Sequence, residues 1–495
     1  LLVVAGNPTE EQNVLAVAAK KAVREGAKMI VIDSRETELT RYAVEWLRPR
    51  PGSEALLIAG ISRAIFDEAL EDKEFVATRI EQGEALKQSL WAFDLAKVSR
   101  DTGIEESQIR RAARIFATSD AGAILLGANG LDDSAAEKLV DAAVDLSAIT
   151  GNIGRAFGGI YPLYQGANTL GARDMGATPG ENGLGIIDMI PAMSRGDIKA
   201  ALVMADGVSG YAPALEGLPI ALGNLDFLVV SAVFDSEITA QADVVLPAAT
   251  YAEQSSTVTN VERRVQLLRV TAEPRHEELT GWETIARIAR AMGSTDFAHG
   301  SSSDVFAEIA GNISNYRELS HEVLLSGGIQ WPVDSSSVVG TPLLYADSTQ
   351  KVTVVQLSYD ELAESIGTSA LTFAPGRVLN QPARDVKVRK PGEMNYIDRE
   401  QLVQIHPDDA KATGLREGDL IQVKTEDGHV LACGTAVYES PQPGLVGSTT
   451  LFGELATRMH ELEAPDWAPL MPGLGFTRVT LETAPVEQEA GAAAD

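Results

Sequence analysis

The sequence predicts an α/β protein with two Rossmann-like, parallel-sheet lobes and a C-terminal third dominated by strands. The first lobe is indicated by two apolar runs, LLVVAG and AKMIVID, which flank an alanine-rich helix and so form a βαβ unit. The second lobe is indicated by three short apolar runs, at 199–206, 225–231 and 243–246. From about Val352 onward, short strand-like runs and an Asp427–Gly428 turn signal predict strands.

The composition limits the classes of partner and cofactor. The chain has 495 residues and a formal net charge of −29, and this length is enough for roughly three domains. We expect no nucleic-acid partner, because binding to phosphates requires a basic face. No apolar run reaches the roughly 20 residues of a membrane helix, so we expect no direct membrane insertion and a cytoplasmic location. The single cysteine, Cys433, excludes an iron–sulfur cluster built from this chain's own thiolates, since such a cluster needs about four.

Polar residues stand where the predicted strands of the first lobe end. Gly6 and Asn7 follow the first strand, and Asp33 ends the second. Asp33 therefore lies at the carboxyl edge of a parallel sheet, where a carboxylate can accept hydrogen bonds from a ribose. The next helix should start with a capping box formed by Thr9 and Gln12. Because the GxGxxG fingerprint is absent, the residues alone leave nucleotide binding and a plain structural unit equally open.

Two later segments suit close contact with a ligand. Residues 150–180 are rich in glycine and cannot form a long helix, because each glycine costs about 1 kcal/mol there. Residues 242–266 begin as a short strand that Pro247 stops, since proline has no N–H for the ladder. The segment ends with Arg263 and Arg264, whose guanidiniums suit carboxylates or phosphates. Ordinary ion pairs of a solvated loop are the other interpretation.

Several segments, in the same order, resemble the molybdopterin oxidoreductase superfamily. The run ADVVLPAATYAEQSSTVTNVERRVQ is similar to a characteristic segment of that superfamily, and SRETELT, RPGS, TGNIG, GAN and GARDMG match further motifs. The resemblance implies that the C-terminal strands form a six-stranded β-barrel of the double-psi type. It also implies an α/β pterin-dinucleotide-type lobe at 1–164, a second α/β lobe at 165–333, the barrel at 334–480 and a disordered tail at 481–495.

The resemblance further implies a site for molybdopterin guanine dinucleotide. Its guanosine diphosphate would lie at the carboxyl edge of the first lobe. The chain opens on a strand without Met, as if inside a longer polypeptide. The metal-ligating side chain and the cysteines of a [4Fe-4S] cluster would therefore precede Leu1, and no metal ligand or catalytic residue is assigned here. The implied cofactor-binding residues are Gly6, Asn7, Asp33, Arg35, Gly52, Asn168, Asp243 and Gly376.

Within the superfamily, three functional interpretations remain. The first is the molybdopterin-oxidoreductase-like part of the large iron–sulfur subunit of complex I, which passes electrons from NADH toward quinone. Tyr164 favours it, because it stands where formate dehydrogenases carry the arginine that steers formate. The second is a catalytic bis-molybdopterin-guanine-dinucleotide oxidoreductase, such as a formate dehydrogenase alpha subunit, acting on a small oxyanion or carboxylate. The third is a nonredox assembly module. The partners implied are other subunits of a respiratory or redox complex, which would also mediate any peripheral membrane attachment.

Overall fold

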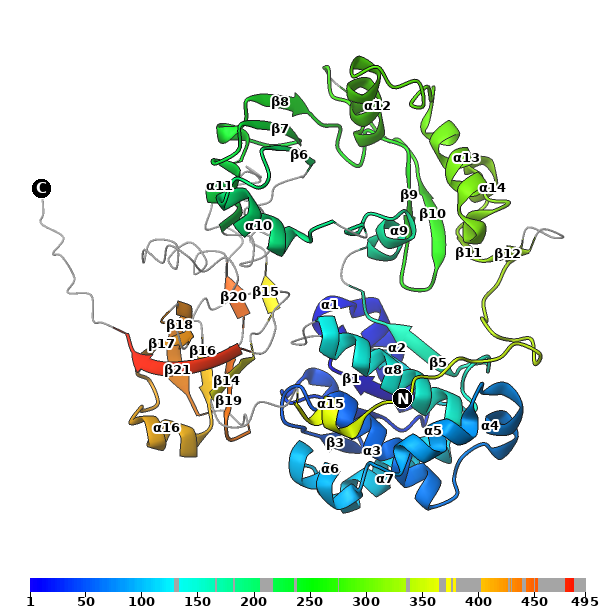
Figure 1. The fold of residues 1–495 in the computed structure, drawn as a ribbon, viewed down its shortest axis with the longest axis vertical. Coiled ribbons are helices and arrows are strands. Elements are labelled where there is room, and N and C mark those ends of the chain that lie inside the picture. The colour runs from blue at the N-terminus through cyan, green and yellow to red at the C-terminus, as the bar shows by residue number, and fades with distance from the viewer. Residues whose placement is uncertain are drawn as a thin grey trace, which may run out of the picture.

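The computed structural model contains a five-stranded α/β lobe, a second lobe built on a three-stranded sheet, and a closed β-barrel (Figure 1). None of the helices it describes is both long and apolar enough to cross a bilayer. The residues described are 1–128, 133–164, 167–180, 183–204, 217–235, 238–274, 276–334, 339–364, 371–374, 377–379, 402–425, 428, 430–438, 442–448, 450–452 and 477–484.

The first lobe is built on a parallel sheet, as predicted. All its strand pairs are parallel, and their carboxyl ends therefore share one edge. Two short helices, α1 (Pro8–Glu11) and α2 (Asn13–Arg24), follow the first strand. In spatial order the strands are β3 (Glu45–Leu47), β2 (Ile30–Ile32), β1 (Leu2–Val4), β4 (Ala123–Leu126) and β5 (Gly159–Pro162).

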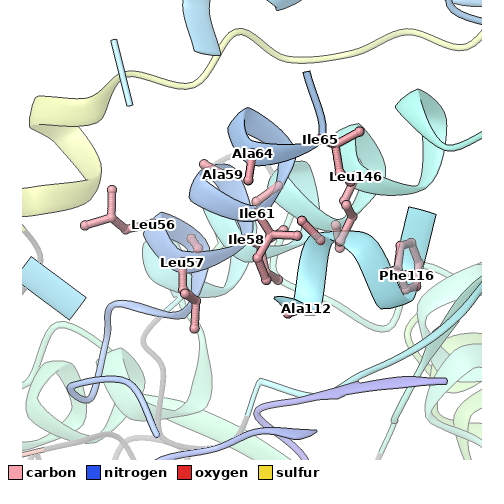
Figure 2. Close-up of a cluster of buried hydrophobic side chains, with 14 of the residues drawn as sticks. Leu56, Leu57, Ile58, Ala59, Ile61, Ala64, Ile65, Ala112, Phe116 and Leu146 are labelled. Carbon is pink, nitrogen blue, oxygen red and sulfur yellow. The ribbon is translucent and has the colours of Figure 1, made fainter. Parts of the chain in front are cut away.

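The core of this lobe surrounds α3 (Glu54–Asp67), which buries twelve of its fourteen residues. A helix that is apolar on nearly every side is expected in a protein interior. Figure 2 shows Ile58, Ile61 and Ile65 of this helix on the side toward Ala112 and Phe116 of one neighbouring helix and Leu146 of another. The surrounding helices are α4 (Lys73–Arg79), α5 (Gly83–Leu90), α6 (Leu95–Thr102), α7 (Glu106–Ala117) and α8 (Asp133–Ile149).

Residues 345–364, expected in the barrel domain, pack instead on the first lobe. Val352, Leu357 and Leu362 join the core around α3, the last of them from α15 (Tyr359–Glu364). The main chain of Val352 also exchanges hydrogen bonds with Arg79 and Glu81. The segment packs here because burying these apolar side chains is favourable, although it follows the second lobe along the chain. We propose that the barrel unit starts at β14 rather than at residue 334.

The second lobe contains a parallel sheet, also as predicted. In spatial order its strands are β6 (Ala200–Met204), β7 (Phe227–Ala232) and β8 (Val244–Pro247). Side chains of α10 (Ile186–Ser194) and α11 (Gly217–Leu222) form an apolar cluster with this sheet.

A separate antiparallel sheet follows, formed by β9 (Ser256–Thr259), β10 (Arg264–Leu268) and β11 (Ile329–Gln330). The short helix α9 (Thr169–Asp174) lies against β9 (Figure 1). The remaining elements of this region are α12 (Gly281–Ala291), α13 (Ser302–Asn312), α14 (His321–Leu324), β12 (Val333–Asp334) and β13 (Val339–Gly340).

One of two predicted helix caps is confirmed. The sequence predicts a helix over 280–292 with a capping box, and α12 has it: the carboxylate of Glu283 accepts the Thr280 amide at 3.0 Å and its hydroxyl at 2.8 Å. The Thr9 cap is wrong, because the Thr9 hydroxyl donates to Asn7 at 2.5 Å. Gln12 separates two helices there, and its side chain is used elsewhere.

The C-terminal strands close into the six-stranded barrel that was predicted. Helix α16 (Pro407–Thr413) precedes one of its hairpins, and a two-stranded ribbon joins β15 (Arg377–Leu379) to β20 (Thr450–Phe452). The predicted tail lies almost wholly outside the described residues. The barrel strands in order are β14 (Leu371–Ala374), β19 (Leu445–Ser448), β16 (Leu402–Ile405), β18 (Val430–Val437), β17 (Leu420–Thr425) and β21 (Thr477–Thr483).

Candidate functional site at the carboxyl edge of the first sheet

The carboxyl edge of the first sheet collects the predicted site residues of that lobe. The strand order reverses direction between β1 and β4, and open parallel sheets bind ligands beside such a reversal. Gly6 and Asn7 follow β1, Asp33 and Arg35 follow β2, and Gly52 lies in the loop after β3. Five of the eight predicted residues are therefore brought to one edge, from three strands.

Asp33 is the most buried charged group among those five, with 4% of its surface exposed. Its Oδ1 atom accepts the main-chain N–H of Arg35 at 2.8 Å, and the Arg35 guanidinium lies 3.6 Å away. Its Oδ2 atom is buried and has no hydrogen-bond partner in the described part of the chain. Burial raises the pKa of Asp33, and Arg35 opposes that rise.

Glu54 is a second buried carboxylate at this edge, at the start of α3 and 2% exposed. Burial is the main reason that the pKa of Glu54 rises to about 8, and the nearby charge of Asp33 adds to it. Backbone N–H groups, including that of Gly52, oppose the rise. The positive φ of Gly52, 84°, is the left-handed conformation that glycine tolerates. The Oε2 atom of Glu54 has no partner among the residues described.

Hydrogen bonds fix the backbone of the loops after β2 and β3 near Asp33. The hydroxyl of Ser34 donates to the Pro49 carbonyl at 2.7 Å, which joins the loop after β2 to the loop after β3. The indole of Trp46 donates to the carbonyl of Asp33 at 3.0 Å, and the Arg48 guanidinium lies 4.5 Å from the Trp46 ring centroid. The backbone that carries Asp33 is thus held by its neighbours.

Near this edge, two more buried oxygens have no hydrogen-bond partner among the described residues, Gln12 Oε1 and Thr37 Oγ1. Unsatisfied buried acceptors are rare in native proteins and call for a partner. Four such atoms near the ends of three adjacent strands suit a ligand rich in N–H and O–H donors. A guanine base, a pterin and ribose hydroxyls carry such donors. The residues present therefore fit a pterin guanine dinucleotide.

Gly127, which no sequence motif indicated, closes the β1–β4 side of this edge. A Cβ atom at Gly127 would overlap the carbonyl oxygen of Ala5 and approach the Cα of Gly6 to 2.7 Å. The obstacle is backbone, so it cannot move aside as a side chain does. The strand ends can lie this close only because residue 127 is glycine.

We expect Gly127→Ala to destabilise the protein by about 2 kcal/mol or more, because it must push β1 and β4 apart. Urea unfolding measures the loss. Gly176→Ala is the matched control for a strained glycine with open surroundings, because Gly176 has a φ of 72° and a Cβ atom added to it would meet no heavy atom within 4 Å. A loss at Gly127 no larger than at Gly176 would contradict the predicted backbone overlap.

The other three predicted residues do not join this cluster. Asn168 is exposed and its Oδ1 atom accepts the main-chain N–H of Thr259 at 2.8 Å, which fixes α9 to β9. Asp243 lies at the amino end of β8, the edge opposite to a carboxyl-edge ligand, and its Oδ2 atom accepts the N–H of Leu228 at 2.7 Å. Gly376 lies outside the described residues.

Arg263 and Arg264 bind backbone carbonyls rather than facing this edge. The Arg263 guanidinium donates to the carbonyl of Trp331, and to those of Thr341 and Pro342 at 3.2 Å each. Arg264 donates to the carbonyl of Gly328 at 2.8 Å. Both arginines therefore have a structural role: they hold the β9–β10–β11 sheet to the chain segments beside it.

The barrel contacts the carboxyl edge of the first sheet. The side-chain amide of Gln442, just before β19, donates to the carbonyl of Arg48. Figure 1 shows the barrel beside the first lobe. Among the described residues, no three His, Cys, Asp or Glu side chains converge as a metal-ligand set.

Comparison with known proteins identifies two family matches. Residues 1–291 match the molybdopterin oxidoreductase family, and residues 371–470 match the molybdopterin dinucleotide binding domain. The F420-dependent formate dehydrogenase subunit alpha of Methanocaldococcus jannaschii is 30% identical over 97% of this chain and 76% of its own length. The assimilatory nitrate reductase catalytic subunit of Bacillus subtilis is 29% identical over 87% of this chain and 67% of its own length.

The solved structure of acetylene hydratase from Pelobacter acetylenicus has a similar fold, with a TM-score of 0.62 and 20% sequence identity. The match covers 90% of this chain and 70% of that protein. The two named sequence relatives are oxidoreductases by name. They favour the formate dehydrogenase alternative, and the complex I interpretation is not supported.

Proposed function

Because this chain belongs to the molybdopterin oxidoreductase family, we propose that it is the catalytic part of a bis-molybdopterin-guanine-dinucleotide enzyme. Its substrate class is a small carboxylate or oxyanion. The proposal extends to assembly with other subunits of a redox complex, since relatives of this chain are named alpha subunits.

The single observation that carries the proposal is the pair of buried carboxylates at the first sheet edge. Asp33 and Glu54 each present an oxygen without a partner among the residues described. Carboxylate acceptors at one sheet edge complement the N1–H and amino group of guanine, which are both donors. A structural ion pair does not explain them, because Arg35 lies 3.6 Å from the other oxygen of Asp33. Desolvating two acids without a ligand is costly.

The chain's own residues would bind and orient the cofactor. When bound, the cofactor supplies a molybdenum or tungsten centre for two-electron transfer. The acceptors of Asp33 and Glu54 would hold the guanine, and the loop containing Gly6 and Asn7 would lie along the phosphates. Gly127 packs directly against this loop. The contact of Gln442 with the Arg48 loop would close the barrel over the same edge.

We also infer that the barrel has the double-psi arrangement. Two of its strand pairs, β14 with β19 and β16 with β18, are parallel, whereas its other pairs are antiparallel. An up-and-down barrel has antiparallel pairs only. Parallel neighbours require crossover connections, and these suit the interlocked double-psi topology.

Metal and nucleotide analysis of the purified full-length protein tests the proposed function. We expect molybdenum or tungsten near one atom per chain by mass spectrometry. We also expect about two guanine nucleotides per metal after acid release of the cofactor. A metal-free and nucleotide-free protein, purified from cells that load a known molybdoenzyme, would refute the proposal and return the assembly-module interpretation.

A further inference from the structure

An exposed phenylalanine lies in a strained turn at the amino edge of the first sheet. Phe157 precedes β5 by two residues, and 87% of its surface is exposed. Its φ of 65° is a left-handed conformation that a bulky residue rarely adopts. The main-chain N–H of Gly158 donates to the carbonyl of Arg155 at 3.1 Å and closes the turn. The turn therefore holds an aromatic ring in water at a cost in both backbone strain and hydration.

The loop that carries this turn is fixed by contacts on two sides. On one side, the Oδ1 atom of the buried Asn152 accepts the N–H of Gly122 at 2.7 Å, and the N–H of Gly159 donates to the carbonyl of Gly122 at 3.0 Å. On the other side, a Cβ atom added to Gly154 would overlap the carbonyl oxygen of Tyr345. Because the loop is already ordered, presenting the ring to a partner costs little further conformational entropy.

Two more exposed aromatic side chains adjoin the same loop. Tyr161 is 41% exposed, and its hydroxyl donates to the Gly158 carbonyl at 3.3 Å. Tyr345 is 46% exposed, and it is the other aromatic residue, besides Phe157, among the seven non-glycine residues with positive φ in the described chain. Aromatic residues make up only 5% of the sequence. Three exposed rings at one loop are therefore a concentration typical of the centre of a protein interface.

The surroundings of these three rings are acidic. The loop contacts the rest of the first lobe at Asp72, where a Cβ atom on Gly151 would overlap the carboxylate, and also at Gly122 and Tyr345. Within two residues of these three contacts the chain carries more acids than bases: Glu71, Asp72, Glu74, Asp120 and Asp347 against Lys73, with Arg155 in the loop itself. Together with the net charge of −29, this favours a basic protein surface as the partner and opposes an anionic membrane.

We propose that Phe157, Tyr161 and Tyr345 form a docking surface for a partner subunit, which seats the Phe157 ring in an apolar pocket surrounded by basic side chains. The inference rests on the part of the proposed function that concerns assembly, and it deepens that part. A few buried aromatic anchors supply most of the binding energy at many interfaces. The surface lies at the amino edge of the first sheet, opposite to the candidate cofactor site, so binding here should leave cofactor content unchanged.

Phe157→Gly tests the anchor, because it removes the ring while suiting the backbone. Glycine adopts a positive φ readily, so the midpoint of urea unfolding should not fall. The chain is purified with the subunits that accompany it in its own cells, and its Kd for the co-purifying subunit is measured with the separated components. The Kd should rise roughly 30-fold, the size expected for a central aromatic anchor, and Phe157→Leu should recover part of the loss. Tyr251→Ala is the matched control, because Tyr251 is 81% exposed and follows β8, outside this surface.

A photoreactive benzoylphenylalanine at position 157 should cross-link to that same subunit. An unchanged Kd for Phe157→Gly overturns the inference. A cross-link to a second copy of this chain also overturns it, as does binding to phosphatidylcholine–phosphatidylglycerol vesicles that Phe157→Gly abolishes. A molybdenum- and guanine-loaded enzyme that purifies without any other subunit overturns the inference and leaves the proposed cofactor standing. A complex that cross-links through position 157 but holds neither metal nor nucleotide overturns the proposed cofactor and leaves the docking surface standing.

Discussion

Replacing Glu54 by glutamine should stabilise the cofactor-free protein and weaken its hold on the dinucleotide. The pKa of Glu54 is about 8 in the folded chain because of burial, against about 4.3 in an unfolded chain. Between these values the folded state keeps a proton that the unfolded state has lost. Stability therefore falls as pH rises through this window, and the full cost is present above about pH 8. Glu54→Gln removes this cost, and we expect a gain of about 1–3 kcal/mol at pH 8.

The same substitution removes an acceptor from the proposed guanine site. We expect the purified variant to contain roughly one tenth of the wild-type guanine nucleotide, or less, because an amide N–H donor replaces one oxygen that would accept from the base. Urea unfolding of cofactor-free protein at pH 5 and pH 8 measures the stability, and nucleotide release measures the binding. Glu84→Gln is the control, an exposed glutamate in the first turn of α5. Normal nucleotide content in Glu54→Gln would exclude Glu54 from the site.

Replacing Asp145 by asparagine should raise stability at neutral and alkaline pH without affecting the cofactor. Asp145 lies on α8 and is 1% exposed, with neither carboxylate oxygen in a well-formed hydrogen bond within the described structure. Burial raises its pKa to about 8, and Asp141 one turn earlier adds to the rise, while the main-chain amide of Val355 opposes it in part. The folded acid keeps its proton up to that pH, whereas the unfolded acid loses it near pH 4.

The unfolding free energy of the wild type should therefore decrease from about pH 4 to about pH 8 through this group and then level off. Asp145→Asn should flatten part of that decrease and add about 1–3 kcal/mol at pH 8. Thermal unfolding of the wild type and of Asp145→Asn across this pH range measures the difference in stability. Glu137→Gln is the matched control, because Glu137 is exposed on the same helix. A pH profile of Asp145→Asn that runs parallel to the wild type would contradict the assignment.

The two substitutions act in the same pH window but differ in function. Asp145 lies on α8, away from the carboxyl edge, so its replacement should leave nucleotide content unchanged. Glu54 lies at that edge, so its replacement should lower the nucleotide content. The contrast separates a buried acid that only costs stability from one that is retained for binding, a trade-off common at functional sites.

The sequence by itself determined the elements whose signals are local. The apolar runs around Val3, Val31 and Leu125 became β1, β2 and β4, because a strand buried on both faces appears as a continuous apolar run. The α12 capping box depends only on Thr280 and Glu283, three residues apart. The motif order was also sufficient to indicate the family, which the comparisons confirm.

Only the tertiary structure decided the features that depend on distant partners. Strand β3 has no strong apolar run of its own and forms because β2 offers a parallel edge to Glu45–Leu47. Residues 345–364 pack on α3 because apolar burial there outweighs chain position. The burial of Glu54, the overlap at Gly127 and the left-handed conformation of Phe157 are likewise absent from the sequence pattern. Desolvation and steric fit are properties of the folded surroundings, so no local run of residues encodes them.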